Sequence, residues 1–120
     1  MCAHRDDDRE PAGVSPDGFR DVMAHLAAGV TVITAVADGI DHAMTATSFI
    51  SVSLDPPLVL VCVENDSRFH EAMSATTRWN ATILSAQQRG RARWFATSGR
   101  PLVGQFDSTP TERSDLTGAL

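Results

Sequence analysis

The sequence has few cysteines, a shortage of basic residues and no long apolar run, and each shortage excludes a class of protein. Its 120 residues carry 10 basic and 15 acidic side chains, a net charge of −5, whereas a general nucleic-acid binder needs a basic surface. No apolar stretch approaches the roughly 20 residues of a membrane-spanning helix, so no membrane partner is expected. Cys2 and Cys62 are not expected to pair, which fits a reducing, cytoplasmic location.

Several catalytic and metal-binding signatures are also missing. The sequence has no Gly-rich phosphate loop and no nucleophile elbow around a serine. The charged first residues lack the hydrophobic segment of a secretory signal. We expect residues 1–14 to form a disordered tail and residues 15–120 to form one domain. No metal site is predicted, because the histidines lack close ligand spacing: His4, His25, His42 and His70.

Residues 43–63 are the most informative part of the chain. They open with the small and hydroxylated side chains Thr45-Ala46-Thr47-Ser48. In residues 50–54, apolar side chains alternate with serines, which is the period of a strand with one buried face. Asp55-Pro56-Pro57 interrupts this strand, because proline has no N–H to donate. Residues 58–63 are an unbroken apolar run, which is typical of a strand covered on both faces.

The corner of small residues at 45–48 has two interpretations. Hydroxyls and the N–H groups of a turn can hold a phosphate or the polar edge of a heterocycle. The small side chain of Ala46 would then let a flat ring lie against the backbone. Serine and threonine clusters also serve turns and caps, so the spacing alone leaves a plain β corner open.

The remaining residues predict alternating helices and strands. Ser15-Pro16 predicts a helix start, and Gly29 is placed to end that helix. Its apolar stripe is expected to pack in the core: Phe19, Val22, Met23 and Leu26. Strands are expected at residues 30–37, 40–45 and 79–84, with a hairpin at Asp38-Gly39 between the first two. Short helices are expected after Ser67 and after the capping box at residues 85–88, and residues 104–114 are expected to form a loop.

His42 and a group of three arginines are each interpreted as structural or solvent-exposed residues rather than as functional ones. His42, in the returning strand, is interpreted as a surface or edge residue. The arginines at 89, 91 and 93 are interpreted as a solvated helix face, with contact to a nucleotide phosphate as the alternative.

Four segments together resemble the flavin reductase family, which has the FMN-binding split-barrel fold. They are residues 19–23 with 29–34, residues 44–49, residues 51–60 and residues 94–96, and the third is the most specific. The resemblance implies a mainly β protein with flanking α-helices, an antiparallel Greek-key split barrel. Family members continue with further barrel strands, so we expect this chain to supply the N-terminal two-thirds of the fold and to leave the barrel incomplete.

The same resemblance implies a flavin reductase that passes a hydride from NADH or NADPH to FMN or FAD. The reduced flavin would supply a partner monooxygenase, and two subunits would form a homodimer with each flavin near the interface. The cofactor carries the chemistry in such an enzyme, so no catalytic side chain is predicted. Two alternatives stay open: a flavin-binding protein without reductase activity, and a truncated non-functional remnant.

The resemblance also implies a set of cofactor-binding residues. The backbone of residues 45–48 would hold the isoalloxazine edge, hydroxyls such as those of Ser48 and Ser67 would bind phosphate, and residues 62–64 would shield the ring. A plain N-cap role for Ser67 stays open, because Phe69 stands where the family commonly has threonine. Phe95 would pack beside the flavin or in the core. The predicted set is Thr45, Ala46, Thr47, Ser48, Cys62, Val63, Glu64, Ser67 and Phe95.

Overall fold

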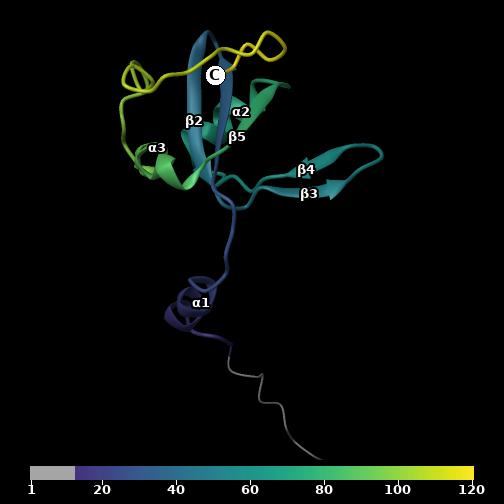
Figure 1. Cartoon of the computed structure of the whole chain (residues 1–120), viewed down its shortest axis with the longest axis vertical. Coiled ribbons are helices and arrows are strands. Elements are labelled where there is room, and N and C mark those ends of the chain that lie inside the picture. The colour runs from purple at the N-terminus through teal and green to yellow at the C-terminus, as the bar shows by residue number, and fades with distance from the viewer. Residues whose placement is uncertain (1–12) are drawn as a thin grey trace, which may run out of the picture.

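The computed structural model describes residues 13–120, so the predicted tail lies almost wholly outside the described residues. Figure 1 shows a β-rich body, a helix that stands off from it and a hairpin that projects from it. The Cα radius of gyration is 19.8 Å, above the value of about 14 Å for a compact domain of this length. The elements are α1 (Pro16–Met23), β1 (Thr31–Ala37), β2 (Ile40–Ala46), β3 (Ile50–Ser53), β4 (Leu58–Leu60), α2 (Arg68–Ser74), β5 (Trp79–Ile83), the short 3₁₀ helix η1 (Ala86–Gln88) and α3 (Arg89–Ala96).

The body is built on a three-stranded antiparallel sheet in the order β2-β1-β5. The predicted hairpin between β1 and β2 is confirmed, with Asp38 and Gly39 at φ values of 51° and 73°, as a tight two-residue hairpin turn requires. After a long connection, β5 returns to lie beside β1, with Ala81 opposite Ile33. The first strand of the chain is therefore the central strand of this sheet. A second sheet contains only β3 and β4.

Strand β1 is the centre of the core, because helices and strands cover most of its length. Ile33 and Ala35 are fully buried, and they form one cluster with Ala46 and Phe69. A second cluster joins Val32, Ala43 and Phe95. Phe69 lies on α2 and Phe95 on α3, so the two helices each pack an aromatic side chain against the β1–β2 hairpin.

Helix α1 begins where the sequence predicts, but it is not buried. Ser15 Oγ accepts a hydrogen bond from the Gly18 N–H at 3.1 Å, which is the predicted N-cap. The helix ends at Met23 rather than near Gly29. The predicted core role of its apolar stripe is wrong within this chain, since Phe19 is 59% exposed and Leu26 is 62% exposed. The residues that follow α1 run from the helix to the β-rich body (Figure 1), and no side chain of α1 is buried.

The prediction of a deeply buried strand at residues 58–63 is also wrong. Strand β4 contains only Leu58–Leu60, and all three side chains are about half exposed. Cys62 is exposed as well, and so are the apolar residues of β3. The physical reason is that β3 and β4 pair only with each other, so within residues 13–120 no second layer covers the ribbon.

The other elements match the predictions within a residue or two. Strand β5 and helix α2 are confirmed, and the Gln88 side chain accepts from the Ser85 N–H at 2.8 Å, which is one half of the predicted capping box. Residues 104–114 adopt turns and irregular structure. Within the described part of the chain, no helix combines the length and apolar character that crossing a bilayer would demand.

Candidate functional site

A pocket of about 420 Å³ opens between strand β2, the loop before α2 and the loop that follows α3. Four residues of the predicted cofactor-binding set line it: Thr45, Glu64, Ser67 and Phe95. They come from three segments that are far apart in the sequence. The fold therefore brings nearly half of the predicted set together around one cavity.

Ser67 organises the loop that forms one wall of the pocket. Its hydroxyl donates to the Glu64 carbonyl at 2.7 Å and accepts from the His70 N–H at 3.1 Å. The N-cap interpretation is thus confirmed. Because its single O–H already donates to the Glu64 carbonyl, the hydroxyl has no proton left for a phosphate oxygen, and Ser67 contributes to the pocket mainly by fixing the conformation of residues 64–67.

Thr45 and Phe95 connect β2 to α3 at the opposite wall. Thr45 Oγ1 donates to the Ala92 carbonyl at 2.7 Å, which holds the middle of α3 against the strand. Phe95, one turn further along, is 3% exposed and packs on Val32 and Ala43. The core alternative for Phe95 is therefore confirmed, although the residue is also among those that line the pocket.

The other predicted residues lie outside the pocket lining. The side chain of Ala46 is 5% exposed and packs with Ile33 and Phe69, which leaves only its backbone for a ring to contact. Thr47 is exposed. The Ser48 hydroxyl forms hydrogen bonds with the backbone N–H and carbonyl of Cys62. Val63 packs against the first core cluster.

Sequence reasoning missed Arg100, which crosses from the loop after α3 to strand β2. Its guanidinium donates to the Phe95 and Thr97 carbonyls at 3.0 and 3.1 Å, to Gln105 Oε1 at 3.1 Å and to the Ala43 carbonyl. It also lies over the Phe95 ring, 5.5 Å from the centroid. Burial lowers the pKa of Arg100, and the positive charge of Arg68 lowers it further. No local signal marks this arginine, because Ala43 is 57 residues away in the sequence.

Arg68 and His42 add to the electrostatics of the same pocket. Arg68 Nη2 donates to the Arg100 carbonyl at 3.0 Å. Burial lowers the pKa of His42, and the charge of Arg68 adds to this effect, while Asp41 and Asp38 oppose it. His42 is thus a half-buried pocket residue, and the prediction of an edge residue is confirmed because β2 is an outer strand of the sheet.

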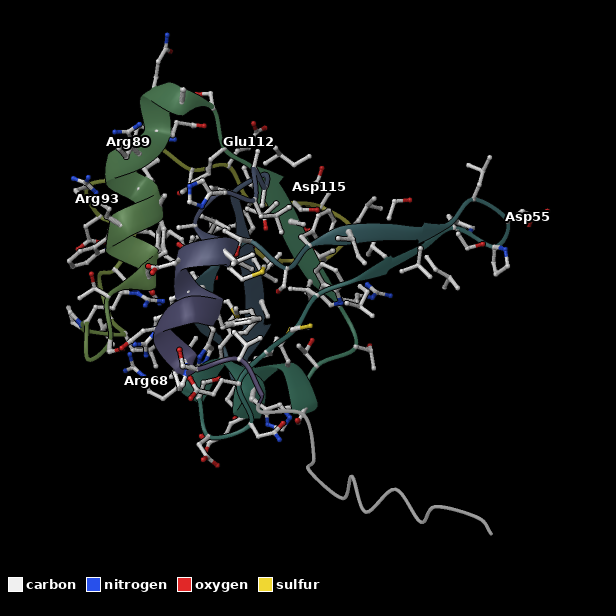
Figure 2. All side chains as sticks on the ribbon, turned by 90° about the horizontal axis from the view of Figure 1, so that it is seen from below. Asp55, Arg68, Arg89, Arg93, Glu112 and Asp115 are labelled. Carbon is white, nitrogen blue, oxygen red and sulfur yellow. The ribbon has the colours of Figure 1, made fainter. Side chains whose placement is uncertain are left out.

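The arginines of α3 do not face this pocket. Arg89 and Arg93 are exposed and lie along the outer side of the helix (Figure 2), as expected for a solvated face. Arg91 lines a different, smaller cavity. Among residues 13–120, no group of three or more His, Cys, Asp or Glu side chains is placed to hold a metal ion.

The residues that line the pocket include the aromatic Phe69 and Phe95, the basic Arg68 and Arg100 and the acidic Glu64 and Asp66. Arginine forks recognise phosphate and carboxylate oxygens, and an apolar wall with a few polar groups is typical of small-molecule sites. The arrangement therefore suits the binding of an anionic, partly aromatic ligand.

Comparison with known proteins points the same way. The flavin reductase like domain matches residues 23–119. An NADH:riboflavin 5'-phosphate oxidoreductase of Streptomyces pristinaespiralis is 48% identical over 95 residues, which is 78% of this chain and 53% of that protein. An NADH-dependent FAD reductase of Streptomyces globisporus is 42% identical over 102 residues, which is 84% of this chain and 56% of that protein. The chain thus spans about half the length of these curated relatives.

Solved structures give the same result for the fold. The NADH:FAD oxidoreductase SgcE6 of Streptomyces globisporus C-1027, in complex with NAD and FAD fragments, superimposes with a TM-score of 0.80 at 38% identity, over 88% of this chain and 64% of that chain. BorF, the flavin reductase component of a bacterial two-component tryptophan halogenase, gives 0.79 at 41% identity, over 87% and 65%. The predicted fold class, the antiparallel split barrel of these reductases, is confirmed.

Proposed function

Because the chain belongs to the flavin reductase like family, we propose that it serves hydride transfer from NADH or NADPH to FMN or FAD. The observation that carries the proposal is the family match over residues 23–119. The relatives named above act with NADH on riboflavin 5'-phosphate or FAD, which favours NADH as the hydride donor. The flavin supplies the redox chemistry, and the protein supplies the surface that holds it.

The pocket beside β2 is the proposed flavin site. Of the predicted segments, Thr45 would border the ring edge, the loop fixed by Ser67 would lie on the phosphate side and Glu64 would shield the ring, because these residues line the pocket. The convergence of Thr45, Glu64, Ser67 and Phe95 on one cavity supports this assignment. No side chain is asked to act as acid or base, and the role of the chain's residues is to bind, orient and exclude water.

The reduced flavin would leave for a partner flavin-dependent monooxygenase or a related enzyme. BorF, which this chain resembles, is the reductase component of a two-component halogenase. We also propose a homodimer in the cytoplasm. The exposed apolar stripe of α1 and the exposed apolar side chains of the β3–β4 hairpin support a second subunit that covers them, and the free thiol of Cys62 fits a reducing compartment.

A second candidate is a flavin-binding protein without reductase activity. The observation that favours it is that the predicted residues that converge on the pocket beside β2, Thr45, Glu64, Ser67 and Phe95, are all assigned to the flavin and none to the nicotinamide.

One experiment separates the two candidates. Purified protein is titrated with FMN by quenching of flavin fluorescence, and NADH oxidation is followed with and without added FMN. FMN-dependent oxidation above the protein-free rate supports the reductase. Bound flavin without oxidation supports the binding protein. A cooperatively folded protein that neither binds flavin nor oxidises NADH would refute both.

A further inference from the structure

A second cavity lies on the face of the sheet that α3 covers, and we call it the α3 cavity. Its volume is about 170 Å³. The lining residues come from β1, the end of β5, α3 and the segment 106–120. Phe95 is the one residue that this lining shares with the pocket beside β2, so the α3 cavity is a separate site.

Part of the lining of the α3 cavity is apolar and aromatic. Val32 and Phe95 belong to the second core cluster, and Leu84 and Phe106 pack against that cluster. The ring centroids of Phe95 and Phe106 are 5.0 Å apart, and the two rings are inclined by 38°. Aromatic rings attract one another at separations of this kind. A further ring in the cavity would therefore extend an existing aromatic pair.

The charged residues of the lining are Arg91 and Glu112, and their charges have opposite signs. Within the described part of the chain they form no ion pair with each other. A charged ligand would be attracted by one of them and repelled by the other. The α3 cavity therefore favours an uncharged ligand, in contrast to the pocket beside β2.

The segment that closes the α3 cavity is anchored to the sheet. Residues 109–112 and Leu120 line this side of the cavity. Arg113, which follows them directly, donates two hydrogen bonds of 2.8 Å to the Asp41 carboxylate. The hydroxyl of Thr34 donates to the Leu120 carbonyl. These contacts hold both ends of the segment against the β1–β2 hairpin, so the cavity has a defined wall on this side.

We propose that the α3 cavity binds an uncharged, single-ring aromatic molecule in contact with the Phe95–Phe106 ring pair. The volume suits one ring, because an engineered apolar cavity of about 150 Å³ in another protein binds benzene. The site lies outside the proposed flavin site and does not depend on the proposed function.

The test measures the binding of fluorobenzene by fluorine NMR to the wild-type 120-residue chain and to three variants. Thr82→Phe fills the cavity, because Thr82 lines it and lies opposite Val32 in the sheet. Thr82 is exposed, so the larger side chain should cost little stability. Ile83→Phe is the matched control, because successive side chains of a strand point to opposite faces and Ile83 is 72% exposed. Phe106→Leu removes one ring and keeps an apolar side chain.

We expect the wild type and Ile83→Phe to bind fluorobenzene with dissociation constants that agree within about twofold. Thr82→Phe should weaken binding by at least about tenfold, and Phe106→Leu by about fivefold, because one partner of the aromatic contact is lost. Melting curves show whether each variant folds. If Thr82→Phe does not fold, the comparison of Phe106→Leu with Ile83→Phe decides the question.

Two results would overturn the proposal. One is a wild-type protein that does not bind fluorobenzene at millimolar concentrations. The other is equal affinity in the folded Thr82→Phe and Ile83→Phe proteins, or in Phe106→Leu and Ile83→Phe, which would place the ring elsewhere, including in the pocket beside β2.

Benzoate tests the preference for an uncharged ligand, because it joins a carboxylate to a ring of the same size. We expect benzoate to bind more weakly than fluorobenzene, since Glu112 opposes its charge and the carboxylate must lose water. Benzoate that binds as tightly as fluorobenzene, with the same loss in Thr82→Phe, would overturn the uncharged class of ligand.

Discussion

The hydroxyl of Ser48 bonds both backbone groups of Cys62, accepting from its N–H at 3.1 Å and donating to its carbonyl at 3.3 Å. The β3–β4 hairpin lies between these two residues in the sequence. The contact therefore closes the base of the hairpin where it leaves the body, and it explains how so exposed a ribbon is held at a defined angle.

Ser48→Ala should lower the free energy of unfolding by about 1 kcal/mol, because two backbone groups lose their side-chain partner and gain only water. Urea denaturation measures the effect. Ser51→Ala is the matched control, since Ser51 is exposed on β3. Equal midpoints for the two variants would contradict the structural role of Ser48.

Ala46→Trp and Thr47→Trp place the same side chain on the two faces of the corner. Ala46 is in the core, so the first change should overpack it and cost about 3 kcal/mol or more. Thr47 is exposed, so the second should change stability by less than about 0.5 kcal/mol and weaken FMN binding by obstructing the ring. Urea denaturation and flavin titration measure both. Wild-type stability in Ala46→Trp would show that the corner is oriented differently.

Leu54→Glu tests the proposed homodimer. Leu54 is 92% exposed, so a charge there costs the isolated subunit little, but it would place an unpaired carboxylate in an apolar interface. Light scattering after size exclusion should show that the dimer dissociates at protein concentrations at least about tenfold higher than for the wild type. Val103→Glu, at an exposed valine of the loop after α3, is the control. A monomeric wild type would refute the homodimer.

His42 should make stability depend on pH. Its pKa in the folded protein is lowered from the ordinary value of 6.5, so between the two values the unfolded chain binds more protons and stability rises with pH. The loss of stability caused by protonating His42 is fully present below the pKa of His42 in the folded protein and disappears above about pH 6.5. His42→Gln should flatten the rise of the melting temperature with pH just below neutrality. A profile with the same slope in both proteins would contradict the assignment.

Local signals in the sequence predict the local structure well. The Asp38-Gly39 turn and the caps at Ser15 and Ser67 each depend on neighbouring residues, so the sequence contains all the information that they need. Burial was predicted less well. Alternation in β3 and the stripe on α1 tell which side chains share a face, but they do not tell whether this chain provides a surface to cover that face.

The same limit applies to the site. Residue types mark Thr45, which lines the pocket, and the N-cap at Ser67, while the ligand-binding role of residues 45–48 stays a prediction. The sequence does not identify Arg68 and Arg100 as pocket residues, because they come together only when the loop after α3 folds back on β2. Arg100 then contacts residues such as Ala43, which are far away in the sequence.

Helix α1 has eight residues and no buried side chain. A helix this short is marginal in water without tertiary contacts. Its ellipticity in solution should therefore depend on whether another surface receives it. On dilution, α1 would unfold before the sheet does. The helical ellipticity of α1 would therefore measure the association of subunits.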